Sequence, residues 1–323
     1  MNLSGWDVHT HLVPRTVLEA AERERHRLAL SSGQLVVEDR DRLPLRRLGH
    51  PPALLDWVEQ QQLDGAVASV PPPLFRYHLT GSAAAGWAQL INDGMAALAG
   101  LDGGRLRVLG HLPLSEPSLA CGVAREVLAD GGFSGFAVGT LGAGPGFADP
   151  ALDELWEVLD AAGSFVLLHP SASPDHRLSP YYLSNLLGNP YETALAAAGL
   201  VFGNVIGRFR RIRFCLCHGG GVTAAVAGRW QRGADTARPG IGSLALTPRT
   251  ALRHLYVDDL VHDQDMLQLV ESTFGPEHVL TGSDWPFPMG CDTIDRTRAA
   301  ARAELTEGLT RPATAQGWRR LGS

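Results

Sequence analysis

The strongest constraint on the fold is the alternation of short apolar runs with amphipathic helical patterns. Eight apolar runs have the length of a β-strand, at residues 6–11, 63–70, 106–112, 133–138, 165–169, 212–218, 254–257 and 279–284. Helical patterns follow them at residues 52–62, 82–101, 117–130, 149–162, 190–209, 222–232 and 263–274, and residues 291–305 or 312–321 supply an eighth. Eight strands that alternate with helices predict an α/β fold, the (β/α)8 TIM barrel, as one domain over residues 1–323.

Two segments are longer than the connections of a minimal barrel. Residues 12–51 follow the first strand and carry eight arginines, and residues 171–189 follow the fifth strand. Both connect a strand to the next helix, so both belong to the face where barrel active sites form. We expect residues 12–51 to be a small lid insertion, and ordinary surface decoration is the alternative for both segments.

The charged residues exclude several classes of protein. The chain of 323 residues has 28 basic and 34 acidic side chains and a net charge of −6, whereas a nucleic-acid binder would show a basic face. All the basic residues are arginine, which excludes a Schiff-base enzyme and a lysine-bearing P-loop. A metal pair bridged by a carbamylated lysine is excluded for the same reason. We therefore expect no nucleic-acid partner and no lysine chemistry.

The apolar runs and the cysteines indicate where the protein works. No apolar run reaches the roughly 18 residues of a membrane span, and no signal peptide precedes Trp6. The four cysteines lack the spacing of a zinc ribbon and are expected to be reduced and mostly buried: Cys121, Cys215, Cys217 and Cys291. We expect a cytoplasmic protein with no membrane partner.

Histidines and an aspartate stand at the ends of four predicted strands. His9 and His11 close the first strand, and residues two apart in a strand point to the same side. His169 ends the fifth strand, His218 the sixth, and Asp284 the eighth. Any one of these side chains alone is more often structural, but the carboxyl ends of barrel strands all open on one mouth. Together they predict a site for a divalent metal ion.

Four motifs carry a resemblance to a known family. DVHTH at residues 7–11, LLHPS at 167–171, CHGGG at 217–221 and TGSDWPFP at 281–288 resemble the amidohydrolase-2 family. The sequence looks most like its 2-amino-3-carboxymuconate-6-semialdehyde decarboxylase branch. The resemblance implies a single divalent ion, held by His9, His11, His169 and Asp284 and completed by a water. Three histidines and an aspartate suit zinc, and manganese and iron stay open.

The same resemblance implies roles for further residues. His218 corresponds to the histidine that activates the water or passes a proton, and Phe287 to an aromatic residue beside the substrate. The family also uses a lid arginine for the substrate carboxylate, and the candidates here are Arg40, Arg42, Arg46 and Arg47. Tyr182 stands where the decarboxylase has another aromatic residue. Arg229, and less closely Arg238, resemble arginines that reach a neighbouring subunit's pocket, which implies a homodimer.

Three functions are compatible with these residues. The first is a metal-dependent carboxy-lyase that releases carbon dioxide from a small unsaturated or aromatic acid, with His218 or Asp284 as proton donor. The second is a hydrolase or hydratase that acts on a lactone, an amide or an unsaturated acid with the same centre. The third is a barrel that binds a ligand without chemistry. The complete ligand set favours an enzyme, and arginines near the metal would favour decarboxylation.

Overall fold

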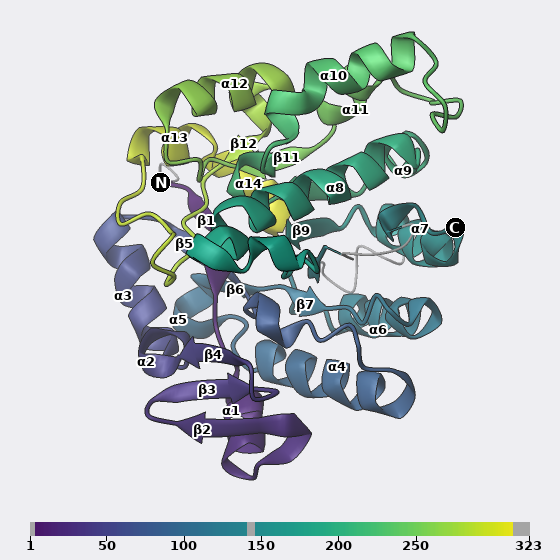
Figure 1. Ribbon diagram of the computed structural model, residues 1–323. Coiled ribbons are helices and arrows are strands. Elements are labelled where there is room, and N and C mark those ends of the chain that lie inside the picture. Colours follow the sequence, from purple (N-terminus) through teal and green to yellow (C-terminus); the bar gives the residue numbers. More distant parts are fainter. Residues whose placement is uncertain (1–3, 141–145, 313–323) are drawn as a thin grey trace, which may run out of the picture. The chain divides into compact units, whose positions relative to one another are not determined.

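The computed structural model describes residues 4–140 and 146–312 (Figure 1). The alternative eighth helix, residues 312–321, therefore lies outside the described residues except for Pro312. The chain divides into two compact units, Met1–Ala137 with Thr281–Ser323, and Val138–Leu280. The predictions of one domain over residues 1–323 and of a lid role for residues 12–51 stay predictions.

Parallel strands form the core of the first unit. β1 (Trp6–His11) pairs with β5 (Gly65–Ser69), and β5 pairs with β6 (Leu106–Val108). β7 (Gly110–His111) continues this run and pairs with the start of β8 (Phe136–Gly139). On the other edge of β1, the His11 amide donates to the Trp285 carbonyl at 2.9 Å, and Thr10 bridges Trp285 in parallel.

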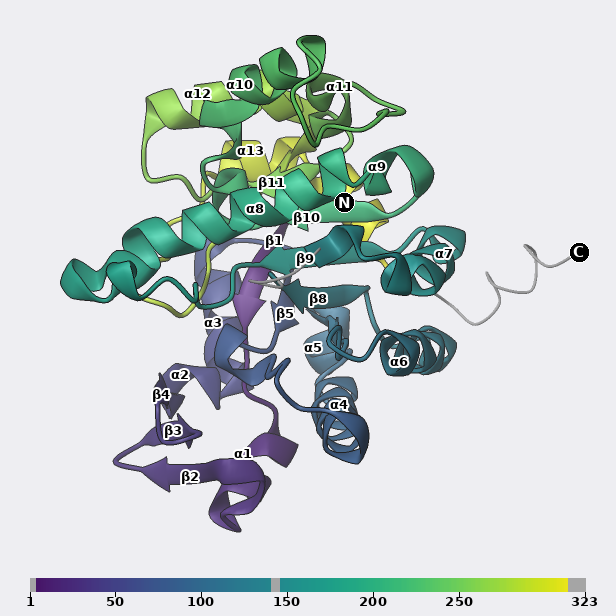
Figure 2. The same cartoon turned by 45° about the vertical axis from the view of Figure 1, so that its right-hand side comes forward.

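Helices follow the strands of the first unit. They are α3 (Pro51–Gln61), α4 (Gly81–Ala96), the short α5 (Leu101–Gly104) and α6 (Pro117–Asp130). α4 and α6 lie side by side (Figures 1 and 2). The chain returns to this unit through α13 (Arg296–Ala301) and α14 (Ala303–Thr310), and α14 packs near β1.

The second unit repeats the same alternation. Its parallel strands follow the order β9 (Phe165–His169), β10 (Arg213–Leu216), β11 (Tyr256–Asp258) and β12 (Val279–Leu280). Its helices are α7 (Asp153–Ala162), α8 (Asn189–Phe202), α9 (Val205–Arg208), α10 (Thr223–Asp235), α11 (Pro248–Leu252) and α12 (Gln264–Phe274). The strands are buried on both faces, as in parallel sheets covered by helices.

The predicted (β/α)8 fold class is confirmed, while several predicted boundaries are wrong. The third strand is interrupted between β6 and β7, and the helix predicted at 190–209 breaks at Asn204, which has a left-handed φ of 61°. The sixth and eighth strands end early, at Leu216 and Leu280. The helix predicted from residue 291 starts only at Arg296, because Asp295 caps it by accepting from the amides of Thr297 and Arg298.

The insertion after β1 is a small antiparallel sheet flanked by helices. It contains α1 (Arg15–Glu22), β2 (Leu28–Ser31), β3 (Gln34–Val37), β4 (Asp41–Pro44) and α2 (Leu45–Leu48). β3 is the central strand and pairs with both neighbours (Figure 2). Its apolar residues Leu35 and Val37 are buried, so the insertion has a core of its own.

A buried ion pair attaches the insertion to the connection that follows β5. Glu38 lies just after β3, and its Oε1 accepts from Arg76 Nη2 at 2.7 Å and Nε at 3.1 Å. His78 Nε2 lies 2.6 Å from the same oxygen, and the Arg76 guanidinium stacks on Trp87 of α4. Burial raises the pKa of Glu38, but the Arg76 hydrogen bonds and charge outweigh it and leave that pKa below its usual value. Glu38 is therefore held as a carboxylate.

Among the described residues, none of the helices is both long and apolar enough to cross a membrane.

Candidate metal centre

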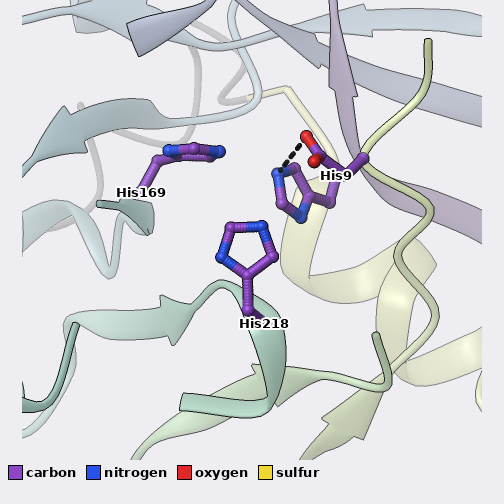
Figure 3. A group of neighbouring side chains, drawn as sticks. His9, His169 and His218 are labelled. Atoms are coloured by element: carbon purple, nitrogen blue, oxygen red, sulfur yellow. Dashed lines mark ion pairs between the residues drawn. The ribbon is translucent and has the colours of Figure 1, made fainter. Parts of the chain in front are cut away.

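β1 presents two histidines to one carboxylate. His9 and His11 are fully buried, and their ring centroids lie 5.2 Å apart with an interplanar angle of 81°. Asp284 Oδ1 lies 3.3 Å from His9 Nε2 and 3.1 Å from His11 Nε2, and Figure 3 marks the ion pair of His9 with a dashed line. These three residues, all in the first unit, aim two imidazole nitrogens at one carboxylate oxygen.

The position of Asp284 depends on a second buried carboxylate, that of Asp7. Asp7 Oδ1 accepts from the Ser283 amide at 3.0 Å, and Oδ2 accepts from Ser283 Oγ at 2.5 Å. Trp57 Nε1 also donates to Oδ2, at 3.2 Å. The Asp284 amide in turn donates to the His9 carbonyl at 2.8 Å. Asp7 thus fixes the segment after β12 beside β1, although the strand ladder has already ended.

Burial shapes the electrostatics of this group. Burial raises the pKa of Asp7 to about 6, against the lowering effect of its hydrogen bonds from Ser283, His9 and Trp57. Burial also lowers the pKa of His11, although the hydrogen bond and charge of Asp284 raise it. A neutral imidazole is the form that binds a metal ion, so this environment favours ligation.

The second unit contributes two further histidines from neighbouring strand ends. His169 ends β9 and His218 follows β10, and their rings lie 5.2 Å apart at 79° (Figure 3). His169 Nδ1 lies 2.9 Å from the Pro170 carbonyl, so Nδ1 carries the proton and Nε2 keeps its lone pair. A backbone carbonyl that fixes the tautomer in this way is common behind metal-bound histidines.

A glycine turn sets the direction of His218. His218 has a left-handed φ of 56° and starts a turn of three glycines. A Cβ at Gly221 would collide with the Pro190 carbonyl, and φ is +61° there. The Gly219 amide donates to Asp258 Oδ1, at the end of β11, at 2.9 Å. The direction of His218 is therefore set by this turn and not by strand alternation, because the strand ends at Leu216.

The donor set suits a divalent ion of borderline softness. His9 and Asp284 in the first unit, and His169 and His218 in the second, each offer one ligand atom. Imidazole nitrogens combined with one carboxylate are typical of zinc and also suit manganese and iron. The residues present therefore fit the metal ion that the sequence predicts.

The other predicted site residues lie in varied surroundings. Phe287 is half-buried, and its ring lies 5.3 Å from that of His11. The insertion arginines are all exposed: Arg40, Arg42, Arg46 and Arg47. In the second unit Tyr182 is 58% exposed, and Arg229 on α10 and Arg238 beyond it are also exposed. Cys291 is half-buried, whereas the other three cysteines are buried.

Sequence reasoning missed the residues that support the ligands. Asp7 and Asp258 accept hydrogen bonds from backbone amides, and the Ser283 hydroxyl donates to Asp7. Asp7 and Asp258 lie in strands β1 and β11 and are fully buried, and a buried carboxylate needs a partner. An aspartate inside a strand was therefore the sequence signal that could have identified them. His111 was also missed, although it ends the third strand.

A barrel with histidines and an aspartate at its strand ends defines a class of metal-dependent enzymes, and the chain belongs to one family within it. It is a member of the amidohydrolase family, whose profile matches residues 6–319. A 2-amino-3-carboxymuconate-6-semialdehyde decarboxylase from Dictyostelium discoideum is 28% identical over 295 residues, which cover 88% of this chain and 82% of that protein. The resemblance inferred from the motifs is confirmed.

Solved structures show the same fold. The apo form of IDCase from Metarhizium anisopliae gives a TM-score of 0.76 at 22% identity and covers 98% of this chain and 94% of its own. A second structure is a 5-carboxyvanillate decarboxylase from Novosphingobium aromaticivorans with bound manganese and 3-methoxy-4-hydroxy-5-nitrobenzoic acid. It gives a TM-score of 0.72 at 15% identity and covers 98% of this chain and 97% of its own. The decarboxylases among these proteins are carboxy-lyases.

Asp7→Asn is expected to lower the free energy of urea unfolding by about 2 kcal/mol, because an amide nitrogen then faces the Trp57 or Ser283 donors. Metal affinity, measured by competition with a chelator, should fall about 10-fold or more, because Asp284 loses its support. Trp57→Phe is the matched control and removes one donor to the same carboxylate, at a cost of about 1 kcal/mol. An Asp7→Asn protein with the stability and metal affinity of the parent would contradict this role.

Proposed function

We propose that the protein is a metal-dependent, non-oxidative decarboxylase of a small unsaturated or aromatic carboxylic acid. The proposal rests on two groups of metal-binding side chains at the ends of parallel strands. The first unit holds His9, His11 and Asp284, and the second holds His169 and His218. The decarboxylase relative that covers most of the chain supports the same reaction. An aminocarboxymuconate semialdehyde or a hydroxybenzoate represents the substrate class.

His9, His11, His169 and Asp284 are the proposed ligands of one divalent ion, with zinc as the expected metal. Manganese is an alternative, because the carboxyvanillate decarboxylase binds it, and iron is also compatible with these donors. When bound, the ion would coordinate substrate oxygens and stabilise the electron density left by the departing carbon dioxide. The side chains of this chain then have to orient the acid and supply a proton to its carbon.

His218 is the proposed proton donor. It is half-buried, so it can exchange protons with solvent, and its glycine turn fixes its direction. An imidazole that gives a proton to the carbon and regains it from water suits a reaction near neutral pH. Asp284 is the alternative donor, but its contacts with His9 and His11 assign it first to the metal.

The proposed substrate-binding residues of the subunit's own site belong to the connections after the first, fifth and eighth strands. Phe287 would pack on the substrate beside His11, and Tyr182 would cover it from the 171–189 segment. A carboxylate of the substrate would pair with an arginine of the insertion, and the candidates are Arg40, Arg46 and Arg47. Their exposure leaves these guanidinium groups available, and residues 12–51 would act as the lid that carries them.

The hydrolase or hydratase alternative uses the same metal ligands and has less support, because the described relatives are decarboxylases. Three of the four cysteines are buried, as expected of reduced thiols in a cytosolic protein, and we place the protein in the cytoplasm.

The decisive experiment measures carbon dioxide and ring opening together. Metal-loaded protein is incubated with hydroxybenzoates, aminomuconate-type acids and lactones. We expect carbon dioxide from at least one acid, a metal content of one ion per chain, and loss of both in Asp284→Ala, because removal of a ligand opens the coordination shell. Hydrolysis of a lactone without carbon dioxide release from any acid would overturn the proposal.

His218→Gln is expected to keep the metal ion and to lower kcat by roughly 100-fold, because a carboxamide cannot transfer a proton. Metal analysis and steady-state kinetics on the same preparation check this. His169→Gln is the comparison and should lose metal and activity together. If His218→Gln loses metal to the same degree, His218 is a ligand and Asp284 becomes the proton donor.

We further propose a homodimer in which Arg229 reaches the neighbouring subunit's site. Arg229 lies on α10 and is exposed, so its guanidinium is available to a second chain. Arginine pairs with a carboxylate through two parallel hydrogen bonds and stays charged when buried, which suits such a position. In a two-fold dimer each subunit would then complete the other's site.

Mixed dimers test this arrangement. Arg229→Ala chains and Asp284→Ala chains, each expected to be inactive alone, should regain activity on mixing, because one site of a heterodimer has both residues. Mixing Asp284→Ala with His9→Ala chains is the control and should restore no activity, because each site of that heterodimer still lacks one ligand. Absence of recovery despite proven subunit exchange would make Arg229 an ordinary surface residue.

A further inference from the structure

His111 ends the third barrel strand of the first unit and has no part in the centre described above. Its side chain is only 2% exposed. Both its amide and its carbonyl are bonded to the carboxamide of Asn92 on α4, at 2.7 and 3.1 Å. The backbone of His111 is therefore fixed, and the direction of its ring is set by the strand.

The strand places the His111 ring on the interior face. A Cβ at the preceding Gly110 would lie 3.0 Å from Val127 Cγ1, so that side of β7 faces helix α6. Successive residues of a strand point to opposite faces, so His111 points away from α6 and toward the barrel interior. Inward residues of alternate strands share a layer in this fold, which places His111 with the inward residues of the first strand.

Two aromatic rings from the connection after β5 lie parallel to the imidazole. The ring centroids of Phe75 and Tyr77 each lie 6.1 Å from that of His111, with interplanar angles of 8° and 15°. The centroids of Phe75 and Tyr77 lie 5.9 Å apart, with an interplanar angle of 9°. Phe75 is buried and Tyr77 is half-buried. Aromatic rings in parallel planes pack better on a flat and conjugated ligand than on a puckered one.

The imidazole has one nitrogen that the protein does not satisfy. Within the part of the chain that the structure describes, the buried Nδ1 of His111 has no hydrogen-bond partner. In a neutral ring this Nδ1 is either an acceptor without a donor or an N–H without an acceptor. An unpartnered N–H is rarer than an unpartnered acceptor, so the neutral ring carries its proton on Nε2.

We propose that His111, with Phe75 and Tyr77, forms a substrate-binding wall on which a planar, conjugated carboxylic acid lies and to one oxygen of which His111 donates from Nε2. The proposal rests on the proposed decarboxylase function and adds a residue that selects its substrate. A phenolate or carboxylate oxygen is the acceptor that this donor fits. Burial also lowers the pKa of His111 to about 3, so the ring stays neutral and the donor persists across the working pH range.

Three variants separate binding from packing. His111→Phe keeps a flat ring of similar size but has no donor, and His111→Gln keeps a donor near the position of Nε2. His254→Phe is the matched control, because His254 is exposed and lies just before β11. The probe is 4-hydroxy-3-methoxy-5-nitrobenzoic acid, and its Kd for the metal-loaded proteins is measured by calorimetry. The metal content of each variant is measured in parallel.

We expect His111→Phe to raise the Kd about 10-fold, and His111→Gln and His254→Phe to stay within about 3-fold, all with unchanged metal content. The ¹⁵N spectrum of the parent should show one neutral histidine whose signal shifts on binding and is missing in His111→Gln. An unchanged Kd in His111→Phe, or failure of the parent to bind the probe, would overturn the proposal. Probe binding that depends on His111 without carbon dioxide release from any acid would instead overturn the proposed function alone.

Discussion

The buried carboxylate of Asp7 is the interaction on which the first half of the site depends. A carboxylate in an apolar interior is costly unless donors surround it, and Asp7 receives them from Trp57, Ser283 and the His9 amide. Ser283 supplies two of the donors, its amide and its hydroxyl, and lies more than 270 positions away in sequence. The carboxylate therefore joins β1 to the segment after β12 and places Asp284 against His9 and His11.

The sequence is informative wherever a residue's role follows from periodicity. β1 and β9 match the predicted strands residue for residue, and α6 matches its predicted helix. His9 and His11 share a face because the strand period is two, so that part of the site follows from the amino-acid pattern alone. α6 is 14 residues long and β9 is apolar up to its final histidine, so the local preference is strong in both.

The remainder could not be predicted because tertiary contacts decide it. The ladder of the eighth strand stops at Leu280, and Asp284 lies in a left-handed conformation with a φ of 57° that no strand pattern contains. The length of the insertion is evident from the sequence, but its antiparallel sheet depends on pairing within β2, β3 and β4 and on Glu38 meeting Arg76. Beside the insertion the structure buries Arg76, whereas the insertion arginines that the sequence pattern favours are exposed.

The two units use the same device to aim a side chain beyond the end of a strand. Asp284 and His218 each have a positive φ, which costs a non-glycine residue about 1 kcal/mol or more. In each unit a buried aspartate accepts from a neighbouring amide, Asp7 from Ser283 and Asp258 from Gly219. These hydrogen bonds offset the strain and leave each side chain one orientation. The direction of each side chain therefore depends on a carboxylate that bonds to the backbone, which explains why a search for chemistry-bearing residues alone overlooks Asp7 and Asp258.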